Sequence, residues 1–508
     1  MRNLTWFFAI YIVDDLKGKL FGIVKRKFVH KRGLKAVKNE NTFDSKNDER
    51  VDLRKKRVRM ARIASIIIFV IVILIGVFII KIMPSEIDAA AVVKAEYPNI
   101  EPYPSNELLP GFDEKYDKWV ESRREIRPES GYGDGLESYF EKTVGEFLRG
   151  TNGENRVFSP LSLYMALSMA AETADGDSRA QILSLIGRED IVDLRKQANA
   201  VWRGSYANDG ATTSIMANSV WLDNELEYNK ATVDSIAKNY YASVFRGEMA
   251  SEELNEAMRS WLNEQTGGLL KDQIKNVGVK DPSTIMALFS TVYYRAKWAT
   301  EFNPKSTVTD VFHTPNGNVD AEYMCRTLEG SYYWSENFAA ISIGLENSGE
   351  MWLVLPDEDV TMDELLADKN LYKLVFSSKG YIPLEEWEDQ KYIKINLRMP
   401  KFDVSSDYSL TDGLKNLGVT DIFNREKADL TPLVTDSELT PYYSSAKQAA
   451  RVTVDEEGVY AAAFTEMMVC GAAMPPEEEV DFTLDRPFLF SLYHNSGLSL
   501  FTGVVNEP

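Results

Sequence analysis

The pattern of hydrophobic and polar positions divides the 508-residue chain into four stretches. Residues 1–62 are polar and basic, and residues 63–83 contain an unbroken apolar run. Residues 84–132 carry six prolines among many charges, and periodic apolar positions then fill residues 133–508. This pattern predicts a basic tail, an apolar span, an extended stalk and one large folded domain.

The apolar run from Ile63 to Ile80 has the length and composition of a membrane-spanning helix. Its eighteen residues carry no charge and would form a helix of roughly 27 Å, about the thickness of a hydrocarbon core. A soluble helix rarely lacks a polar face over five turns, so a buried core helix is the weaker interpretation. A cleaved signal peptide is another alternative, because Ala89-Ala90-Ala91 resembles a cleavage site, but the long segment before the run argues against it. We therefore expect one transmembrane helix over residues 63–83.

The charges on either side of this run predict its orientation. Only Lys81 follows it closely. Basic residues precede it directly, at Arg54, Lys55, Lys56, Arg57, Arg59 and Arg62. By the positive-inside rule the N-terminus is expected in the cytoplasm and the folded domain outside the cell, as a single-pass protein of the cell membrane. Residues 1–62 hold 18 Lys and Arg against 7 Asp and Glu, whereas the rest holds 39 against 70. An acidic folded domain argues against nucleic acid as a partner.

The remainder of the chain mixes helical and strand-like periods. One short helix is expected in the stalk, around residues 113–125. Helical spacing of apolar residues occurs in residues 136–150, 160–174 and 254–268. Alternation typical of strands occurs in residues 213–223, 287–298, 391–404 and 486–494. Because long helices come first and strands dominate later, the expected fold class is α+β with helices and strands segregated.

Few residues in the chain have the chemistry of a catalytic or metal site. The two cysteines, Cys325 and Cys470, exclude a disulfide framework, and both are expected to be free. With only three histidines, a zinc site is not expected either. The S-x-x-K pattern at residues 444–447 and Tyr-Ala-Asn at residues 206–208 match motifs of penicillin-binding proteins, but their order is reversed and no K-T-G follows. An enzyme is therefore the weakest hypothesis.

Residues 452–482 allow two interpretations. Acidic residues followed by alanines between Asp455 and Val469 favour a helix. The alternative is a strand that has yet to form. Alternate positions from Gly458 are all uncharged, at Val459, Ala461, Ala463, Thr465, Met467 and Val469. The only charge in that window, Glu466, lies on the opposite face, as a strand needs if one face enters a sheet over a core.

Five ordered blocks of sequence carry the most specific motifs. They are NRVFSPLSLYMALSMAAETADGDSRAQI (155–182), WLNEQTGGLLKDQI (261–274), KW with the Phe that follows (297–302), MPKFDVSSDYSLTDGLKNLGVTDIFNREKADLT (399–431) and RPFLFSLYHNSGLSLFTGVVNEP (486–508). In this order and spacing they resemble the serpin family over residues 133–508. The resemblance implies an α+β serpin fold with three β-sheets, surrounding helices and an exposed reactive-centre loop, preceded here by one transmembrane helix.

The resemblance also assigns roles to particular residues. It implies that the hinge of the loop consists of Glu456, Glu457, Gly458, Val459, Ala461, Ala462 and Ala463. It implies that opening of the main sheet involves Ser159, Ser162, Ser290, Gln448, Trp298 and Lys401. The family has an Asn and a His where Ser290 and Gln448 stand, and a buried amide can replace an imidazole as donor and acceptor. Lys401 and Glu456 occupy positions that form an ion pair in the family.

The function implied by the resemblance is inhibition of a serine-type endopeptidase as a suicide substrate. The protease attacks the loop, forms a covalent acyl complex and is trapped when the loop inserts as a new strand. Fourteen positions beyond Gly458 lies Ala472, and Pro475-Pro476 follows it at the spacing some relatives have. The expected reactive bond is therefore Ala472–Ala473, followed by a solvated charge run at Glu477–Glu479.

The residues around this bond indicate the class of target. A small apolar residue before the bond suits elastase-like or subtilisin-like proteases, and some cysteine proteases. No catalytic group, metal or cofactor is expected, and the protein is expected to be a monomer. The alternative is a non-inhibitory serpin-fold binding or scaffold protein at the cell surface.

Overall fold

The computed structural model describes parts of the second of two units into which the chain divides, Pro84–Pro508. The described residues are 91–104, 111–346, 349–377, 387–436, 438, 440–459, 476, 478–494 and 497–508. The expected transmembrane helix, the hinge alanines Ala461–Ala463 and the expected bond Ala472–Ala473 lie outside these residues. Within them, no helix combines the length and the apolar character that crossing a bilayer requires.

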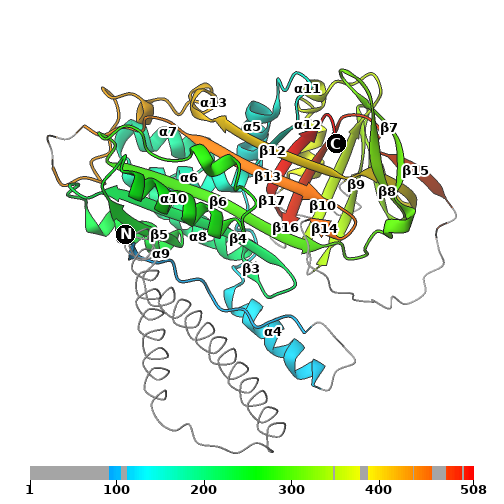
Figure 1. The fold of residues 1–508 in the computed structure, drawn as a ribbon, viewed down its shortest axis with the longest axis horizontal. Coiled ribbons are helices and arrows are strands. Elements are labelled where there is room, and N and C mark those ends of the chain that lie inside the picture. The colour runs from blue at the N-terminus through cyan, green and yellow to red at the C-terminus, as the bar shows by residue number, and fades with distance from the viewer. Residues whose placement is uncertain are drawn as a thin grey trace, which may run out of the picture. The chain divides into compact units, whose positions relative to one another are not determined.

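The first sheet is built around two long antiparallel strands, β4 (Thr213–Asp223) and β6 (Met286–Lys297). The described strands follow the order β1-β5-β4-β6-β14-β13-β12, and β3 pairs with β4. The other members are β1 (Ala91–Val93), β3 (Ala207–Asn208), β5 (Ala242–Gly247), β12 (Phe402–Ser409), β13 (Lys447–Val454) and β14 (Gly458–Val459). Figure 1 shows β6 and β13 running beside each other through the middle of this sheet. Buried and more exposed residues alternate along β13, as one-sided packing on a core requires.

The second sheet contains the remaining described strands, in the order β15-β11-β8-β9-β10-β16-β17-β2, with β7 on β8. They are β2 (Arg156–Phe158), β7 (Val308–Thr314), β8 (Gly317–Trp334), β9 (Phe338–Leu345), β10 (Gly349–Pro356), β11 (Gln390–Pro400), β15 (Glu479–Thr483), β16 (Phe488–His494) and β17 (Leu498–Val505). The described strands thus join into two hydrogen-bonded sheets, where three were expected. The reason is the 18-residue strand β8, which pairs with β7 and β11 along its length and with β9 at its end.

The strand-like stretch 391–404 is divided between the two sheets. β11 ends at Pro400 in the second sheet, and β12 begins at Phe402 in the first. Lys401 therefore lies where the chain passes from one sheet to the other. The prediction of extended structure was confirmed here, but the alternation did not show the change of sheet.

The central helix α6 (Pro160–Thr173) contacts β6 of the first sheet and β17 of the second. All its residues except Ala166 are buried, which explains its almost uniformly apolar sequence. The side chain of Ser159 caps its N-terminus by accepting a hydrogen bond from the Ser162 N–H, and Pro160 occupies the first turn. The opposite face of the first sheet is covered by α10 (Glu252–Gln265), whose Trp261 meets Phe245 of β5 edge-on.

The other described helices surround the two sheets. They are α4 (Phe112–Ile126), α5 (Glu137–Leu148), α7 (Gly176–Ile186), α8 (Ile191–Ser205), α9 (Lys230–Asn239), α11 (Met362–Leu365), α12 (Lys369–Val375) and α13 (Thr411–Asn416). Short 3₁₀ turns occupy Gln273–Asn276, Pro304–Ser306 and Asp421–Phe423. The helices predicted over residues 113–125, 136–150, 160–174 and 254–268 are all present.

Residues 91–104 form an N-terminal arm that packs along the edge of the first sheet. β1 pairs antiparallel with β5, so that Ala91 lies opposite Phe245. Further along the arm, the ring of Tyr97 lies 5.2 Å from that of Trp202, and Ile100 is buried. The arm falls within the stretch expected to be a free stalk. Its few apolar side chains pack against the folded domain. The sequence pattern did not predict this packing, because prolines and charged residues dominate the stretch.

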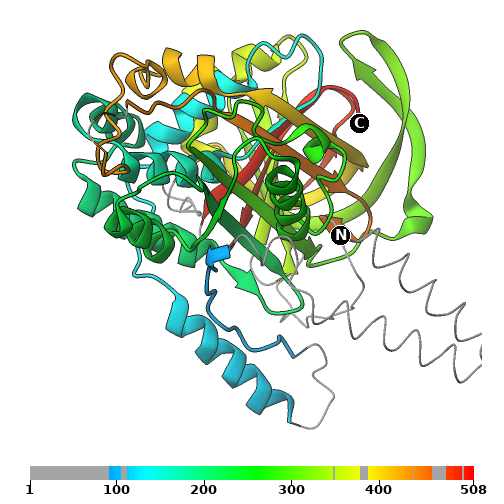
Figure 2. The same cartoon turned by 60° about the vertical axis from the view of Figure 1, so that its left-hand side comes forward.

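Helix α4 follows the arm and lies at the outside of the domain in both views (Figures 1 and 2). Trp119 is its one buried residue, and its indole N–H donates to Asp209 Oδ2 at 3.0 Å. The ring of Tyr103, from the arm, meets Trp119 edge-on at 4.9 Å. The arm and α4 are therefore attached to the same corner of the domain.

Two side chains of the described residues bear on redox state and on pH dependence, the thiol of Cys325 and the imidazole of His494. Cys325, on β8, is a free thiol and half-buried, whereas Cys470 lies outside the described residues. His494, on β16, is buried beside the ring of Tyr294. Burial, assisted by the positive charge of Arg123, lowers the pKa of His494 to about 3.

Acidification is expected to destabilise the protein through His494. The folded state keeps this imidazole neutral down to about pH 3, whereas the unfolded chain binds a proton below about pH 6.5. The loss of folding stability caused by His494 is therefore absent above pH 6.5. It grows as the pH falls and reaches about 2 kcal/mol at pH 5. Melting temperatures at pH 7 and pH 5 should differ clearly less for His494→Gln than for the wild type. The exposed His313 provides the control, and an equal loss of pH dependence in His313→Gln would contradict the assignment.

Candidate functional site: the loop hinge and the sheet opening

The two-residue strand β14 is held between β6 and β13 at one end of the first sheet. Gly458 pairs with Lys297, and Val459 pairs with both Ala296 of β6 and Val454 of β13. A tight turn brings the chain back from β13, because Asp455 Oδ1 accepts hydrogen bonds from the N–H groups of Glu457 and Gly458. The chain thus turns at the hinge and begins a new strand inside the sheet.

Gly458 and Val459 fit this position for different reasons. A Cβ atom on Gly458 would lie 2.4 Å from the carbonyl oxygen of Ala296, so the close approach of two backbones requires glycine. The Val459 side chain is 3% exposed and belongs to the main core. The predicted alternation therefore agrees with the structure at the one inward position that it describes.

Trp298 anchors the turn from the side of β6. Its backbone N–H donates to the carbonyl of Glu457 at 3.2 Å, and its indole N–H donates to the carbonyl of Asp455 at 2.8 Å. The indole is 1% exposed and meets Phe302 edge-on, and Phe302 N–H donates to the carbonyl of Glu456. Asp455 and the first two hinge residues, Glu456 and Glu457, are thus held by the aromatic pair Trp298 and Phe302.

Glu456 carries the charged contact of the hinge. Its carboxylate lies 3.2 Å from Lys401 Nζ and accepts a hydrogen bond of 2.8 Å from the Thr307 hydroxyl. Lys401 also pairs with Glu322 at 3.1 Å. Burial raises the pKa of Glu456, but the hydrogen bonds from Thr307 and Lys401 outweigh it, and the pKa lies below its ordinary value. The expected pair of Lys401 and Glu456 is therefore present, close to Trp298.

Glu456→Lys is expected to loosen the hinge and promote opening of the sheet. The change replaces an attraction with a repulsion at a side chain only 15% exposed. Its cost should lie between those of a surface and a buried ion pair, at about 2 kcal/mol. Heating should then yield more polymer on a native gel and a melting temperature lower by a few degrees.

Glu322→Lys is the matched control for this prediction. Glu322 shares Lys401 as its partner, but it is 64% exposed. We expect little polymer from it. Equal heating behaviour of Glu456→Lys and the wild type would show that the ion pair does not hold the hinge.

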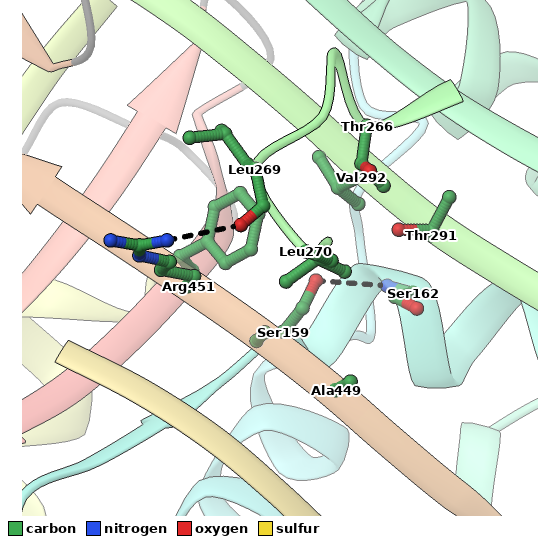
Figure 3. A pocket seen from close by; sticks show the side chains of 11 residues that line it. Ser159, Ser162, Thr266, Leu269, Leu270, Thr291, Val292, Ala449 and Arg451 are labelled. Carbon is green, nitrogen blue, oxygen red and sulfur yellow. Dashed lines mark hydrogen bonds between the residues drawn. The ribbon is translucent and has the colours of Figure 1, made fainter. Parts of the chain in front are cut away.

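Beyond β14, no backbone pairing joins β6 to β13 in the part of the chain that the structure describes. We call this gap the seam. A pocket lies along it, shown in Figure 3, with β6 on one side and β13 on the other. Its lining includes Thr291, Val292, Ala449, Ala450, Ser159 and Leu270. The seam begins where β14 ends, so it follows the path that a longer β14 would take.

The N-terminus of α6 ties together the two strands that border the seam. The Gln448 amide bonds reciprocally with the Ser159 backbone, accepting from its N–H at 2.8 Å and donating to its carbonyl at 2.9 Å. The Ser162 hydroxyl donates to the carbonyl of Ser290 at 2.9 Å. Both β13 and β6 are therefore hydrogen-bonded to the N-terminal end of α6.

The expected polar cluster is thus brought together, with one difference. Gln448 acts as both donor and acceptor, as an imidazole or amide can. Ser290 contributes its backbone carbonyl, while its buried hydroxyl makes no hydrogen bond among the described residues.

Arg451, on β13, makes contacts that were not predicted from the sequence. Its guanidinium forms two hydrogen bonds with the Asp403 carboxylate, of 2.8 and 2.6 Å, and a third of 3.2 Å with the carbonyl of Leu269. The Leu269 bond holds the turn after α10 over the seam, as Figure 3 shows. The sequence offered one indication of the pair with Asp403: Arg451 and Asp403 occupy outward-facing positions of two neighbouring strands, β13 and β12.

The chain returns from the loop at β15, which pairs in parallel with β11. Glu478 and Glu479 form ion pairs of 2.7 Å with Lys391 and Lys394. The charge run expected to be merely solvated is therefore paired at the described positions, although these side chains remain exposed. Both ends of the loop are consequently attached to sheets.

The comparisons with known proteins identify this arrangement. The sequence profile of the family described as Serpin (serine protease inhibitor) matches residues 142–508. The chain belongs to the serpin family. It is 30% identical over 368 residues to Serpin-Z2B of Triticum aestivum, covering 70% of this chain and 90% of that protein. It is 26% identical over 364 residues to leukocyte elastase inhibitor A of Mus musculus, covering 70% and 93%.

A solved structure supports the serpin fold independently. The native state of Tengpin, a thermophilic serpin, matches with a TM-score of 0.65 and 24% sequence identity, over 75% of this chain and 95% of that one. In the protein described here, β14 ends at Val459 in the first sheet and β15 begins at Glu479 in the second. The sequence resemblance designates the segment between these two strands as the reactive-centre loop.

Proposed function

We propose that this serpin inhibits serine-type endopeptidases as a suicide substrate, by inserting its loop into the first sheet. The observation that carries the proposal is β14, which already forms the first two residues of an inserted strand. The seam continues directly from it. The relatives named above include a protein named leukocyte elastase inhibitor A. In the proposed mechanism the protease supplies the catalytic groups.

The geometry of β14 indicates how insertion would proceed. Antiparallel continuation from the Val459–Ala296 pair would place residues 459–469 alongside β6 down to Met286. Each added residue would pair with β6, and those up to residue 466 would also pair with β13, while alternate side chains become buried, which supplies the driving force. The contacts of α6 with Gln448 and Ser290 would have to adjust, because they fix the spacing of the two strands.

Trapping requires that insertion follow cleavage. In the acyl complex the protease serine is esterified to the new C-terminus of the loop, and the peptide after the cut leaves with the amino group. The hinge end is then free to move, whereas the other end stays with β15 and its lysine partners. We propose Ala472–Ala473 as the cleaved bond.

The proposed targets are elastase-like or subtilisin-like proteases. Val469 to Met474 contains no Arg or Lys, and a trypsin pocket would keep its buried Asp unpaired with such a loop. We further propose that residues 63–83 anchor the protein in the cell membrane, with the serpin domain outside the cell as a monomer.

A panel of purified proteases tests the function. We expect an elastase-like or subtilisin-like member to give a covalent complex that survives denaturing electrophoresis. Cleavage of the loop without any such complex would instead support a non-inhibitory binding or scaffold role. The panel should include trypsin, for which little complex is expected.

A further inference from the structure

Glu172, near the C-terminal end of α6, is a buried carboxylate that the proposed mechanism does not use. Its side chain is 1% exposed. It accepts two hydrogen bonds from the Arg195 guanidinium of α8, of 2.5 and 2.7 Å. A third, of 2.8 Å, comes from the hydroxyl of Tyr240, which follows the last residue of α9. Loss of one partner would leave a buried charge uncompensated, so this cluster joins α6 firmly to α8 and α9.

The partners of Glu172 are attached to two strands of the first sheet, β4 and β5. The Tyr240 carbonyl accepts a hydrogen bond of 2.7 Å from the Asn218 side chain of β4, and β5 begins two residues further along the chain. From α8, the Trp202 indole N–H donates to the carbonyl of Met216, also on β4, at 2.7 Å. β4 in turn pairs with β6 along most of its length. We call β4, β5, β6, α8 and α9 the β6 side.

β13 is held to the second sheet, so the β6 side is the one that must move when the seam opens. β2, which pairs with β17 of the second sheet, also donates from the Val157 N–H to Ser406 of β12, the neighbour of β13. The Ser159 hydroxyl donates to the carbonyl of Leu500 on β17, and the Ser159 backbone bonds with Gln448 of β13. Insertion must place β6 and β13 two strand spacings apart, about 9.6 Å. With β13 held in this way, the strands of the β6 side have to shift over α6.

We propose that Glu172 is a positioning residue for loop insertion, because it restrains the β6 side against α6 and keeps the seam closed before the loop is cleaved. The inference rests on the proposed function. Two other hydrogen bonds join α6 to this side, from Ser162 to the Ser290 carbonyl and from Tyr164 to Gln197, and both are between neutral groups. Charge-assisted hydrogen bonds are roughly twice as strong as neutral ones. Loss of the charge at Glu172 should therefore let the seam open more often.

Uptake of a peptide that mimics the inserting loop measures how often the seam opens, without any protease. The probe is a fluorescent peptide with the sequence of residues 460–469, added to the full-length protein. Glu172→Gln keeps the size of the side chain and removes its charge. We expect this variant to take up the peptide about tenfold faster than the wild type does, measured by fluorescence anisotropy. An unchanged rate of uptake would overturn the inference.

Two further variants separate a restraint on the seam from a general loss of stability. Leu353→Ala opens a cavity in the core at β10, which pairs with β9 and β16 in the second sheet. It should lower the denaturant midpoint without faster uptake, and acceleration equal to that of Glu172→Gln would contradict the role of Glu172. Tyr240→Phe removes one hydrogen bond to the carboxylate and should accelerate uptake about threefold. If Glu172→Gln does not fold, an unchanged rate in Tyr240→Phe would overturn the inference instead.

The failure of the proposed function is distinguishable from that of the inference. Uptake of the peptide by neither the wild type nor Glu172→Gln would show that the seam accepts no added strand, which would contradict insertion itself. Absence of a covalent complex with every protease of the panel would contradict inhibition, and with it a role of Glu172 in inhibition. A covalent complex formed by the wild type, together with equal uptake by the two proteins, would leave inhibition standing and refute the restraint by Glu172.

Discussion

Val459→Arg is expected to turn this serpin from an inhibitor into a substrate. Val459 is 3% exposed and pairs with strands on both sides. An arginine there would place a charge in the core on the path of the inserting loop, at a cost of several kcal/mol unless it finds a partner. The fraction of protein that ends as stable protease complex should fall about tenfold or more, while cleavage of the loop continues.

Val459→Ala is the matched control for this substitution. It keeps the position small and uncharged, so most of the complex should still form despite the loss of packing. Stoichiometry titrations followed by denaturing gels measure both variants. Undiminished complex formation by Val459→Arg would mean that trapping does not depend on insertion of a strand that continues from this position.

Ala472→Arg is expected to add trypsin to the proteases that this serpin inhibits. The arginine would pair with the buried Asp of the trypsin pocket, which a small apolar residue leaves without a partner. Discrimination of this kind is large, so the association rate with trypsin should rise about a thousandfold or more. The inhibition of elastase-like proteases should fall in the same variant.

Ala473→Arg tests the register of the bond. If Ala472 precedes the cut, an arginine one residue later should gain little against trypsin. Rates of complex formation under excess inhibitor give the comparison. A larger gain for Ala473→Arg than for Ala472→Arg would move the bond by one residue.

Much of the hinge could be predicted because it depends on local pattern and motif. The alternation that begins at Gly458 indicated an inward Val459, and the structure places that side chain in the core. The pairing of Lys401 with Glu456 also followed from the resemblance. Both involve residues whose neighbours are set by the strand register common to the fold.

Contacts between segments that lie far apart in the sequence could not be predicted. The packing of the arm is one example, because Tyr97 and Ile100 lie among prolines and charged residues and contact apolar residues only in the folded domain. The bond from Arg451 to the carbonyl of Leu269 joins residues 182 positions apart, with no local signal. The number of sheets is a further example. It depends on the 18-residue length of β8, and the sequence of a strand does not indicate which strands pair with it. Neither the membrane segment nor the reactive bond falls within the described residues, and both remain predictions.

The most direct test of loop insertion is the mass of the complex formed with an inhibited protease. Under denaturing conditions, which detach the paired strands β15, β16 and β17, transacylation predicts a mass equal to that of the serpin plus the protease, less the separated peptide Ala473–Pro508. The serpin part of the complex should also resist heating better than the uncleaved protein, because the inserted strand adds pairing on both sides of the seam. The contrary result would be two cleaved serpin fragments and free active protease, with no adduct and no gain in heat resistance.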